Sequence, residues 1–206
     1  MRFHAPLTQV LDNQTKVVCL RLLCNHPTTI SGRQLAKIVN VNPTTVNKAL
    51  NGLINEQVIL VRQVGKSNLY ELNKSHWLVT ELLMPLFKRE SALLDDLINN
   101  ITQKVRRSSL GKEIVSIALF GSVYDGHEKP GSDIDLFVVV SETKFKKKIE
   151  DLIFEIDSNL IPSIGMGMEP YIKTTAEFKK DRDLNVIKSI LKSHRVIWGL
   201  NLEKIL

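Results

Sequence analysis

Features that define several classes of protein are scarce in this sequence. Its 206 residues include only two cysteines, and aromatic residues make up 6%. The cysteines, Cys19 and Cys24, fall five residues apart within one expected helix, which puts their Cα atoms roughly 8 Å apart and beyond easy disulfide reach. We therefore expect two buried free thiols, and no spacing of Cys and His predicts a metal site.

Long uninterrupted apolar runs are also missing. Hydrophobic residues make up 43% of the chain, but the longest stretches are too short or too interrupted to span a bilayer. The amino terminus lacks the uninterrupted apolar core of a signal peptide. We expect a cytoplasmic protein with no membrane partner, long enough to bury one large or two small cores.

Acidic residues are few in the first third of the chain. Residues 1–75 hold nine Lys or Arg against three Asp or Glu, whereas residues 108–206 hold fourteen against fifteen. The net charge of +6 therefore lies at the amino-terminal end. This distribution favours a nucleic-acid partner for that segment, although a solvated basic surface would carry the same charge.

The basic segment has a recognisable order of elements. A helix is expected over Thr15–Cys24, and Ser31 begins a second with the Ser-x-x-Gln pattern of a capping box. Asn42 followed by Pro43 predicts the start of a third helix. Two alternating runs around a short turn containing Gly65 then predict a hairpin. Over residues 8–74 this order resembles the winged helix-turn-helix regulators.

That resemblance implies DNA binding through the third helix and the hairpin. Short polar side chains on the helix would reach base edges, Lys48 a phosphate, and the hairpin the backbone or minor groove. The implied DNA-binding residues are Thr44, Thr45, Asn47, Lys48, Asn51, Arg62, Lys66 and Asn68. The fold also serves as a protein-docking module, so protein docking and RNA binding remain alternatives.

The most informative segment is residues 119–138, which reads LFGSVYDGHEKPGSDIDLFV. Apolar runs over 114–120 and from Asp133 onward predict two buried strands. Because side chains alternate along a strand, Asp133 and Asp135 should point to one face. Such a carboxylate pair suits Mg²⁺, which takes oxygen ligands and substrate phosphates. Gly121 allows close backbone approach, and Ser122 offers donors to phosphate oxygens.

The pattern GSx10DxD resembles the signature of the DNA polymerase β nucleotidyltransferase superfamily, in particular its minimal branch. The resemblance implies that Gly121 and Ser122 contact the triphosphate of an NTP substrate. It implies that Asp133 and Asp135 bind one or two Mg²⁺ ions. Family members transfer a nucleotide to protein, RNA or small-molecule hydroxyls, and a toxin–antitoxin pair is one setting for a minimal member.

Two departures from the family pattern bear on catalysis. Many minimal members follow the Gly-Ser pair with a segment like Ala-Arg-Gly, whereas this chain has Tyr124 and Asp125 there and lacks the basic residue. The family also uses a third carboxylate on a later strand, for which the candidate is Glu169. Its implied role is metal ligand or base for the attacking hydroxyl. The alternative is a glutamate at the rim of a strand.

These observations predict an α+β protein in three parts. They are a winged helix-turn-helix domain at 1–75, a helical linker at 76–107 and a small mixed-sheet nucleotidyltransferase domain at 108–206. The apolar stripe of residues 91–107 would pack on the transferase sheet or pair with a second copy in a homodimer.

We expect a DNA-binding protein that transfers a nucleoside monophosphate from an NTP to a hydroxyl on a partner macromolecule, such as a protein, in a Mg²⁺-dependent reaction. The alternative is a transcriptional regulator whose degenerate transferase domain only senses nucleotide or mediates dimerisation.

Overall fold

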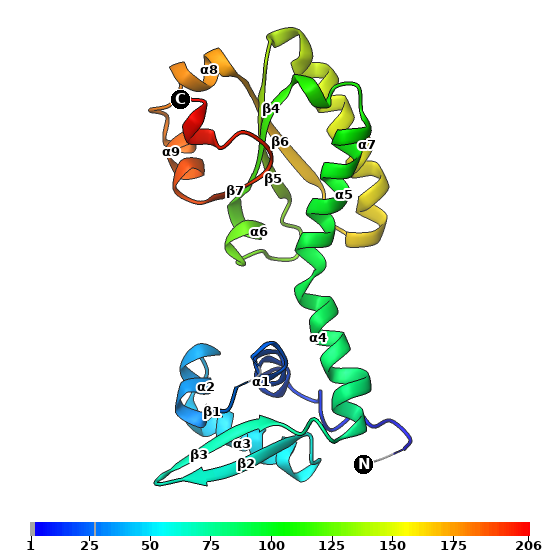
Figure 1. Ribbon diagram of the computed structural model, residues 1–206, viewed down its shortest axis with the longest axis vertical. Helices are drawn as coiled ribbons and strands as arrows, with labels where there is room; N and C mark the ends of the chain where they lie inside the picture. Colours follow the sequence, from blue (N-terminus) through cyan, green and yellow to red (C-terminus); the bar gives the residue numbers. More distant parts are fainter. Residues whose placement is uncertain (1–2, 27) are drawn as a thin grey trace. The chain divides into compact units, whose positions relative to one another are not determined.

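The computed structural model describes residues 3–26 and 28–206, without the side chains of 159–161 and 163 (Figure 1). The chain forms two compact units, Met1–Leu94 and Asp95–Leu206. Both mix helices and strands, as an α+β chain should. The expected domain limits at 75 and 107 stay a prediction.

The first unit is a winged helix-turn-helix. Its elements are α1 (Gln14–Asn25), β1 (Ile30–Ser31), α2 (Gly32–Ile38), α3 (Pro43–Asn55), β2 (Ile59–Val64) and β3 (Ser67–Leu72). The strands form an antiparallel sheet in the order β1-β3-β2, and β2 and β3 make the wing. The predicted order of three helices and a hairpin is confirmed.

Local capping explains where the helices of this unit begin. The hydroxyl of Ser31 accepts from the backbone N–H of Gln34, and the Gln34 side chain accepts from the N–H of Ser31, so the predicted capping box is present. The Asn42 side chain accepts from the N–H of Thr44, with Pro43 in the first turn of α3. Both predicted starts are therefore confirmed, because each satisfies otherwise unpaired N–H groups.

Helix α1 carries both cysteines, and both are free. Cys19 is buried and Cys24 partly so. Burial raises the pKa of each thiol to about 11. Neutral, poorly reactive thiols are the expected result, which agrees with a packing role.

Three helical segments follow the wing: η1 (Val79–Leu83), α4 (Met84–Ser91) and α5 (Leu93–Arg107). The first is π-helical, and the N–H of Met84 donates to the carbonyl of Val79. This wider turn comes directly before Pro85, whose ring would clash with a carbonyl in a regular helix. The π turn therefore accommodates Pro85 within the helical segment.

The second unit contains a four-stranded mixed sheet. Its strands are β4 (Ile114–Phe120), β5 (Ile134–Val140), β6 (Met168–Thr174) and β7 (His194–Gly199), in the order β6-β5-β4-β7. Strand β4 is antiparallel to β5 and β7, whereas β5 and β6 are parallel. The helices are α6 (Gly121–Asp125), α7 (Lys146–Ile164), α8 (Thr175–Lys180) and α9 (Asn185–Lys192), with short 3-10 turns η2 (Gly111–Glu113), η3 (Thr143–Phe145) and η4 (Leu202–Lys204).

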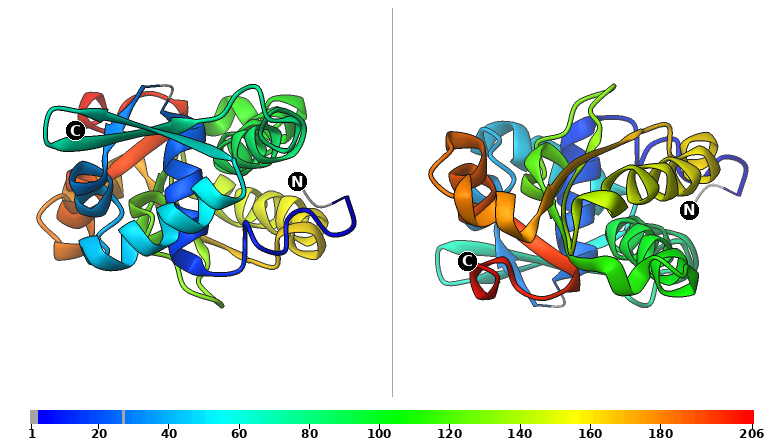
Figure 2. Two further views of the ribbon diagram at one scale, coloured as in Figure 1. Left: turned by 90° about the horizontal axis from the view of Figure 1, so that it is seen from below. Right: turned by 90° about the horizontal axis from the view of Figure 1, so that it is seen from above.

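Helices cover both faces of this sheet (Figures 1 and 2). Helices α5 and α7 lie on one face, and α8 and α9 on the other. On the second face Phe137 of β5 packs against Phe178 of α8, with ring centroids 5.1 Å apart. Ile187 and Ile190 of α9 join the same buried cluster.

The last two helices are separated by a short break. Helix α8 ends at Lys180 and α9 begins at Asn185. Asp181, just after α8, pairs with Lys173 of β6 at 2.8 Å, which fixes the chain direction there. The apolar segment that follows α9 forms the edge strand β7.

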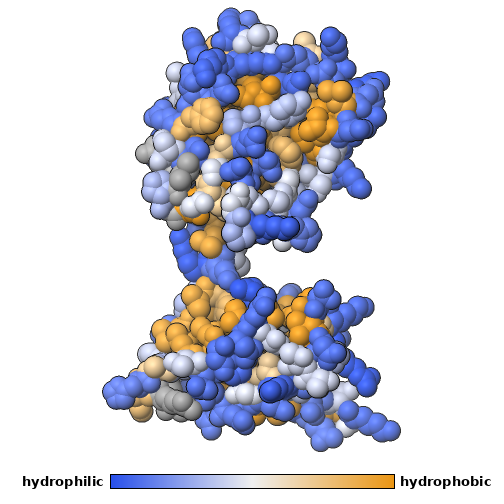
Figure 3. All heavy atoms as spheres, turned by 180° about the vertical axis from the view of Figure 1, so that it is seen from behind, coloured by the Kyte–Doolittle hydropathy of each residue, from blue (hydrophilic) through white to orange (hydrophobic). Residues whose placement is uncertain are grey.

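Large apolar side chains are also exposed on both units. Trp77 and Leu93 are examples in the first unit and Phe154 in the second. Figure 3 shows such side chains as patches among mainly hydrophilic atoms on one face. Within the described part of the chain, no helix is long and apolar enough to cross a membrane.

Candidate functional site

The predicted carboxylates meet at one end of the sheet in the second unit. Asp133 directly precedes β5, Asp135 is its second residue, and Glu169 is the second residue of β6. In the parallel pairing of β5 with β6, Asp135 lies opposite Glu169. Side chains paired in this way point to the same face. The structure thus places the candidate third carboxylate beside Asp135, while its role stays a prediction.

The Gly-Ser turn approaches the same carboxylates from β4. Phe120, the last residue of β4, pairs with Asp135, and Gly121 begins the short helix α6. Gly121 has φ of +74°, and an added β-carbon would lie 2.0 Å from Oδ2 of Asp135. Only glycine fits here, because both the backbone conformation and the contact exclude a side chain. Ser122 is the next residue of α6.

Like charges and partial burial shape the electrostatics of this site. The pKa of Asp135 is raised from its ordinary value, first by burial and then by the nearby charges of Glu169 and Asp133. Among the described residues, no Lys or Arg forms an ion pair with any of these three carboxylates. Their mutual repulsion would be relieved by a cation bound between them.

The fit of a metal ion to these residues can be judged from their chemistry. Three carboxylates without His or Cys are the oxygen ligands that Mg²⁺ prefers. In the described residues, however, no three His, Cys, Asp or Glu side chains are gathered closely enough to hold an ion by themselves. Mg²⁺ commonly retains waters and shares substrate phosphates, so an incomplete cage agrees with binding of a metal together with a nucleotide.

The segment that departs from the family pattern is tied to the edge strand. The hydroxyl of Ser193 donates to the carboxylate of Asp125, the last residue of α6, at 2.7 Å, and Gly126 follows with φ of +69°. Asp125 therefore anchors the end of α6 beside β7. Its side chain accepts a hydrogen bond and does not replace the basic residue that many minimal family members have in this segment.

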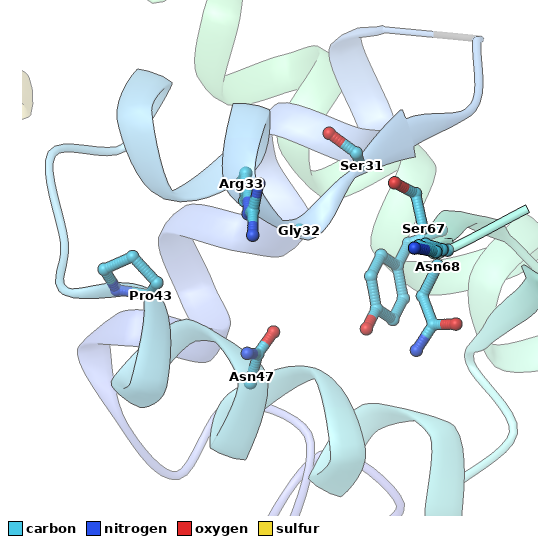
Figure 4. A pocket seen from close by; sticks show the side chains of 9 residues that line it. Ser31, Gly32, Arg33, Pro43, Asn47, Ser67 and Asn68 are labelled. Atoms are coloured by element: carbon cyan, nitrogen blue, oxygen red, sulfur yellow. The ribbon is translucent and has the colours of Figure 1, made fainter.

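A second candidate site lies on the winged helix. A hollow of about 430 Å³ opens between α2, α3 and the wing (Figure 4). Its lining is polar and basic: Ser31, Gly32, Arg33, Pro43, Asn47, Lys66, Ser67, Asn68 and Tyr70. A β-carbon on Gly32 would lie 3.1 Å from Oδ1 of Asn47 and 3.3 Å from the Tyr70 ring, so this glycine leaves room for both.

The predicted DNA-binding residues are all exposed, but they do not form one surface. Asn47, Lys66 and Asn68 share the hollow. Thr45 and Lys48 line a different one beside α1. The remaining three are Thr44, three residues before Asn47 on α3, Asn51, four residues after it, and Arg62 on β2.

Arg62 shows why the predicted DNA-binding residues do not form one surface. It pairs with Leu69, whereas Asn68 pairs with Gln63. Because neighbouring residues of a strand point to opposite faces, Arg62 and Asn68 lie on opposite faces of the wing. Sequence reasoning missed Arg33 of the hollow. A basic residue in the first turn of α2 was a signal, but only the folded wing brings it near Lys66.

Comparisons with known proteins agree with this architecture. Residues 98–197 match the family model described as a nucleotidyltransferase domain. No curated protein matches the chain.

Three solved structures are similar at low identity. A spectinomycin adenyltransferase from Enterococcus faecialis, with ATP and spectinomycin, is 22% identical, covering 54% of this chain and 59% of that one, with a TM-score of 0.42. A homodimeric winged helix-turn-helix DNA-binding domain from Mycobacterium bovis is 21% identical, covering 45% and 78%, with a TM-score of 0.35. A toxin–antitoxin structure with AMP-PNP is 19% identical, covering 52% and 79%, with a TM-score of 0.35.

Likenesses at these identities and TM-scores carry no argument about activity, so the assignment depends on the family match and on the elements described above. The two units differ in what supports them. The first is defined by its three helices and wing, and the second by the sheet that presents Gly121 and Asp135. This chain therefore joins a winged helix-turn-helix to a second unit whose residues 98–197 match the nucleotidyltransferase domain model.

Proposed function

We propose that this protein binds DNA through its winged helix and transfers a nucleoside monophosphate from an NTP to a hydroxyl on a partner macromolecule, using one or two Mg²⁺ ions. The observation that carries the catalytic half is the register of the sheet. It sets Glu169 beside Asp135, and Asp135 against Gly121. Metal ligands and a phosphate-binding turn are needed within this short range for phosphoryl chemistry.

The reaction follows from the roles of these groups. An acceptor hydroxyl oxygen attacks the α-phosphorus, the bond from that phosphorus to the oxygen bridging the α- and β-phosphates breaks, and pyrophosphate leaves. Bound Mg²⁺ would neutralise charge on the phosphates and on the leaving group. Asp133 and Asp135 are its proposed ligands, with Gly121 and Ser122 against the triphosphate.

Glu169 is the proposed third carboxylate, as metal ligand or as base for the acceptor. Its side chain is exposed, whereas Asp135 is partly buried. An exposed carboxylate can meet the hydroxyl of a large acceptor and take its proton. This exposure supports an acceptor on a macromolecule that docks over the site.

The DNA-binding half is supported by the hollow of the first unit. Arg33 and Lys66 supply positive charge there, and Asn47 and Asn68 supply hydrogen-bonding groups that can contact bases or phosphates. Contacts to phosphate would position the protein, and contacts from α3 would read sequence. The combination of a DNA-binding unit with a transferase unit fits a protein that directs its transfer reaction to DNA or to a partner held near it.

The transfer reaction can be tested with NTPs labelled at the α-phosphate, Mg²⁺ and cell extract. Label should pass to a macromolecule with the wild-type chain and not with Asp133→Ala/Asp135→Ala. As a matched control, Asp151→Ala/Glu155→Ala removes two charges from the exposed side of α7 and should retain transfer. Nucleotide binding without any transfer would contradict the enzyme and leave the nucleotide-sensing regulator.

A further inference from the structure

The second unit contains a buried carboxylate outside the predicted site. Asp157 lies in α7 and is only 6% exposed. One of its oxygens accepts from the backbone N–H of Met168 at 2.9 Å. Burying a carboxylate costs free energy unless the charge is stabilised by hydrogen bonds. The position of Met168 in the fold indicates what the buried carboxylate does.

Met168 is the first residue of β6, and Glu169 follows it. The residue before it, Gly167, accepts at its carbonyl from the N–H of Ile134 at 2.8 Å. Ile134 stands between Asp133 and Asp135. One side chain of α7 is therefore linked, through two consecutive backbone groups, to the strand starts that carry all three predicted carboxylates.

Gly167 lies close to both Asp157 and Asp133. A β-carbon on Gly167 would lie 3.1 Å from Oδ1 of Asp133 and 3.9 Å from Oδ2 of Asp157. Both carboxylates therefore approach the same glycine from different elements. The absence of a side chain here lets α7 hold the backbone of β6 without displacing Asp133.

We propose that Asp157 is a positioning residue, which fixes the start of β6 against β5 so that Glu169, Asp135 and Asp133 form one metal and nucleotide site. This inference rests on the proposed function of that site. Asp157 acts through the backbone and touches neither metal nor substrate. Outer groups of this kind typically contribute 10–100-fold, roughly, to metal affinity.

The test compares Asp157→Ala with Asp157→Asn in the full chain. The asparagine oxygen can still accept from Met168, whereas alanine cannot. Asp151→Asn is the matched control, since it removes an exposed carboxylate from the same helix. Mn²⁺ affinity is measured by water-proton relaxation, and affinity for a nonhydrolysable ATP analogue with Mg²⁺ by calorimetry. Amide hydrogen exchange at Met168 reports the hydrogen bond directly.

We expect Asp157→Ala to lose about 10–100-fold in Mn²⁺ affinity and to exchange the Met168 amide faster. Asp157→Asn and Asp151→Asn should bind close to wild type. If Asp157→Ala does not fold in buffer, sucrose favours its folded state, and all variants are titrated in that medium. Wild-type affinity in folded Asp157→Ala would overturn the inference alone. A wild-type chain that binds neither Mn²⁺ nor nucleotide would overturn the proposed function as well.

Discussion

Oδ2 of Asp135 lies 2.0 Å from the point where a β-carbon of Gly121 would sit. Gly121 has φ of +74°, and Gly126, at the other end of α6, has φ of +69° with nothing within 4 Å of its β-carbon position. The two glycines thus share a left-handed backbone and differ in their surroundings. They form a matched pair that separates backbone strain from contact with the carboxylate.

Gly126→Ala should cost about 1–2 kcal/mol of stability, the price of a left-handed alanine, and retain nucleotide binding. Gly121→Ala should cost more and abolish binding, because its methyl group displaces the Asp135 carboxylate. Urea unfolding and calorimetry with a nonhydrolysable ATP analogue measure the two effects. Equal loss of binding in both variants would count against the contact as the cause.

Asp135→Asn should stabilise the metal-free protein at pH 7. Burial and the charges of Glu169 and Asp133 raise the pKa of Asp135 above its ordinary value of 3.8. The stability contributed by its protonated form is complete below the unfolded pKa and is lost as pH rises through the folded pKa. At pH 7 ionised Asp135 therefore costs stability that asparagine avoids.

The measurement is urea unfolding in EDTA at pH 7 and near pH 4. The advantage of Asp135→Asn over wild type should shrink as the pH falls, while its metal and nucleotide affinity is lost at pH 7. Asp151→Asn serves as control and should give no such gain. A variant less stable than wild type at pH 7 would show that Asp135 is held mainly by favourable contacts.

Glu177 should show the opposite dependence on pH. The hydrogen bond from Lys146 and that from the backbone of Thr174 lower the pKa of Glu177 from 4.5 to about 2. Its contribution is present above the unfolded pKa and is lost as pH falls through the folded pKa. Glu177→Gln keeps a residue able to complete the capping box but removes the charge.

Thermal unfolding followed by circular dichroism should therefore separate wild type from Glu177→Gln most clearly above pH 4.5. The difference should fade as pH approaches 2. In a Lys146→Met background the substitution should have a smaller effect, because the two residues are in contact. A difference between the proteins that is constant with pH would contradict the ion pair as its source.

Lys66→Ala should weaken DNA binding more than Lys74→Ala. Both substitutions remove one exposed positive charge from the first unit, but only Lys66 lines the hollow between α2, α3 and the wing. Loss of one phosphate contact should reduce the slope of log K against log salt concentration by about 1. Fluorescence anisotropy across a salt series tests this, and Arg33→Ala should behave like Lys66→Ala. Identical slopes for Lys66→Ala and Lys74→Ala would remove the hollow from the DNA interface.

Ser116→Ala should leave stability unchanged or raise it by up to about 1 kcal/mol. Ser116 is fully buried in β4, and its hydroxyl has no hydrogen-bond partner among the described residues. Thr174 offers the contrast, because its buried hydroxyl accepts from the N–H of Glu177 and caps α8. Thr174→Ala should cost about 1 kcal/mol. The urea unfolding midpoints of the two variants test both expectations. A clear loss of stability in Ser116→Ala would show that the Ser116 hydroxyl has a hydrogen-bond partner.

Sequence patterns predicted the elements wherever the signal was local. Ser31 and Asn42 mark helix starts through bonds that reach only two or three residues, and alternation around Gly65 marks the wing. The strand ending at Phe120 was likewise predicted, from its apolar run. Pairing between distant segments was less accessible, and the neighbours of Asp135 in the sheet became known only from the register of β4, β5 and β6.

Asp157 and Arg33, which act across elements, were not predicted. Asp157 looks like any polar residue of an amphipathic helix until Met168 is placed against it. Arg33 becomes part of a surface only when the wing folds back toward α2. The break after α8 likewise depends on Lys173, a partner on another element. Chemistry carried by contiguous residues could be predicted, whereas these tertiary contacts could not, and Glu169 was predicted only through the family resemblance.

The parallel pairing of β5 with β6 sets the order in which the three carboxylates can come together. A parallel neighbour requires a crossover. Helix α7 provides it here, so Glu169 meets Asp135 only after that helix has docked. A nascent chain that has emerged only through α7 holds the Gly-Ser turn and two acids but lacks Glu169. Such non-local closure is a slow step in folding. Completion of the carboxylate cluster therefore reports that β6 has paired with β5, whereas the edge strand β7 is not needed for it.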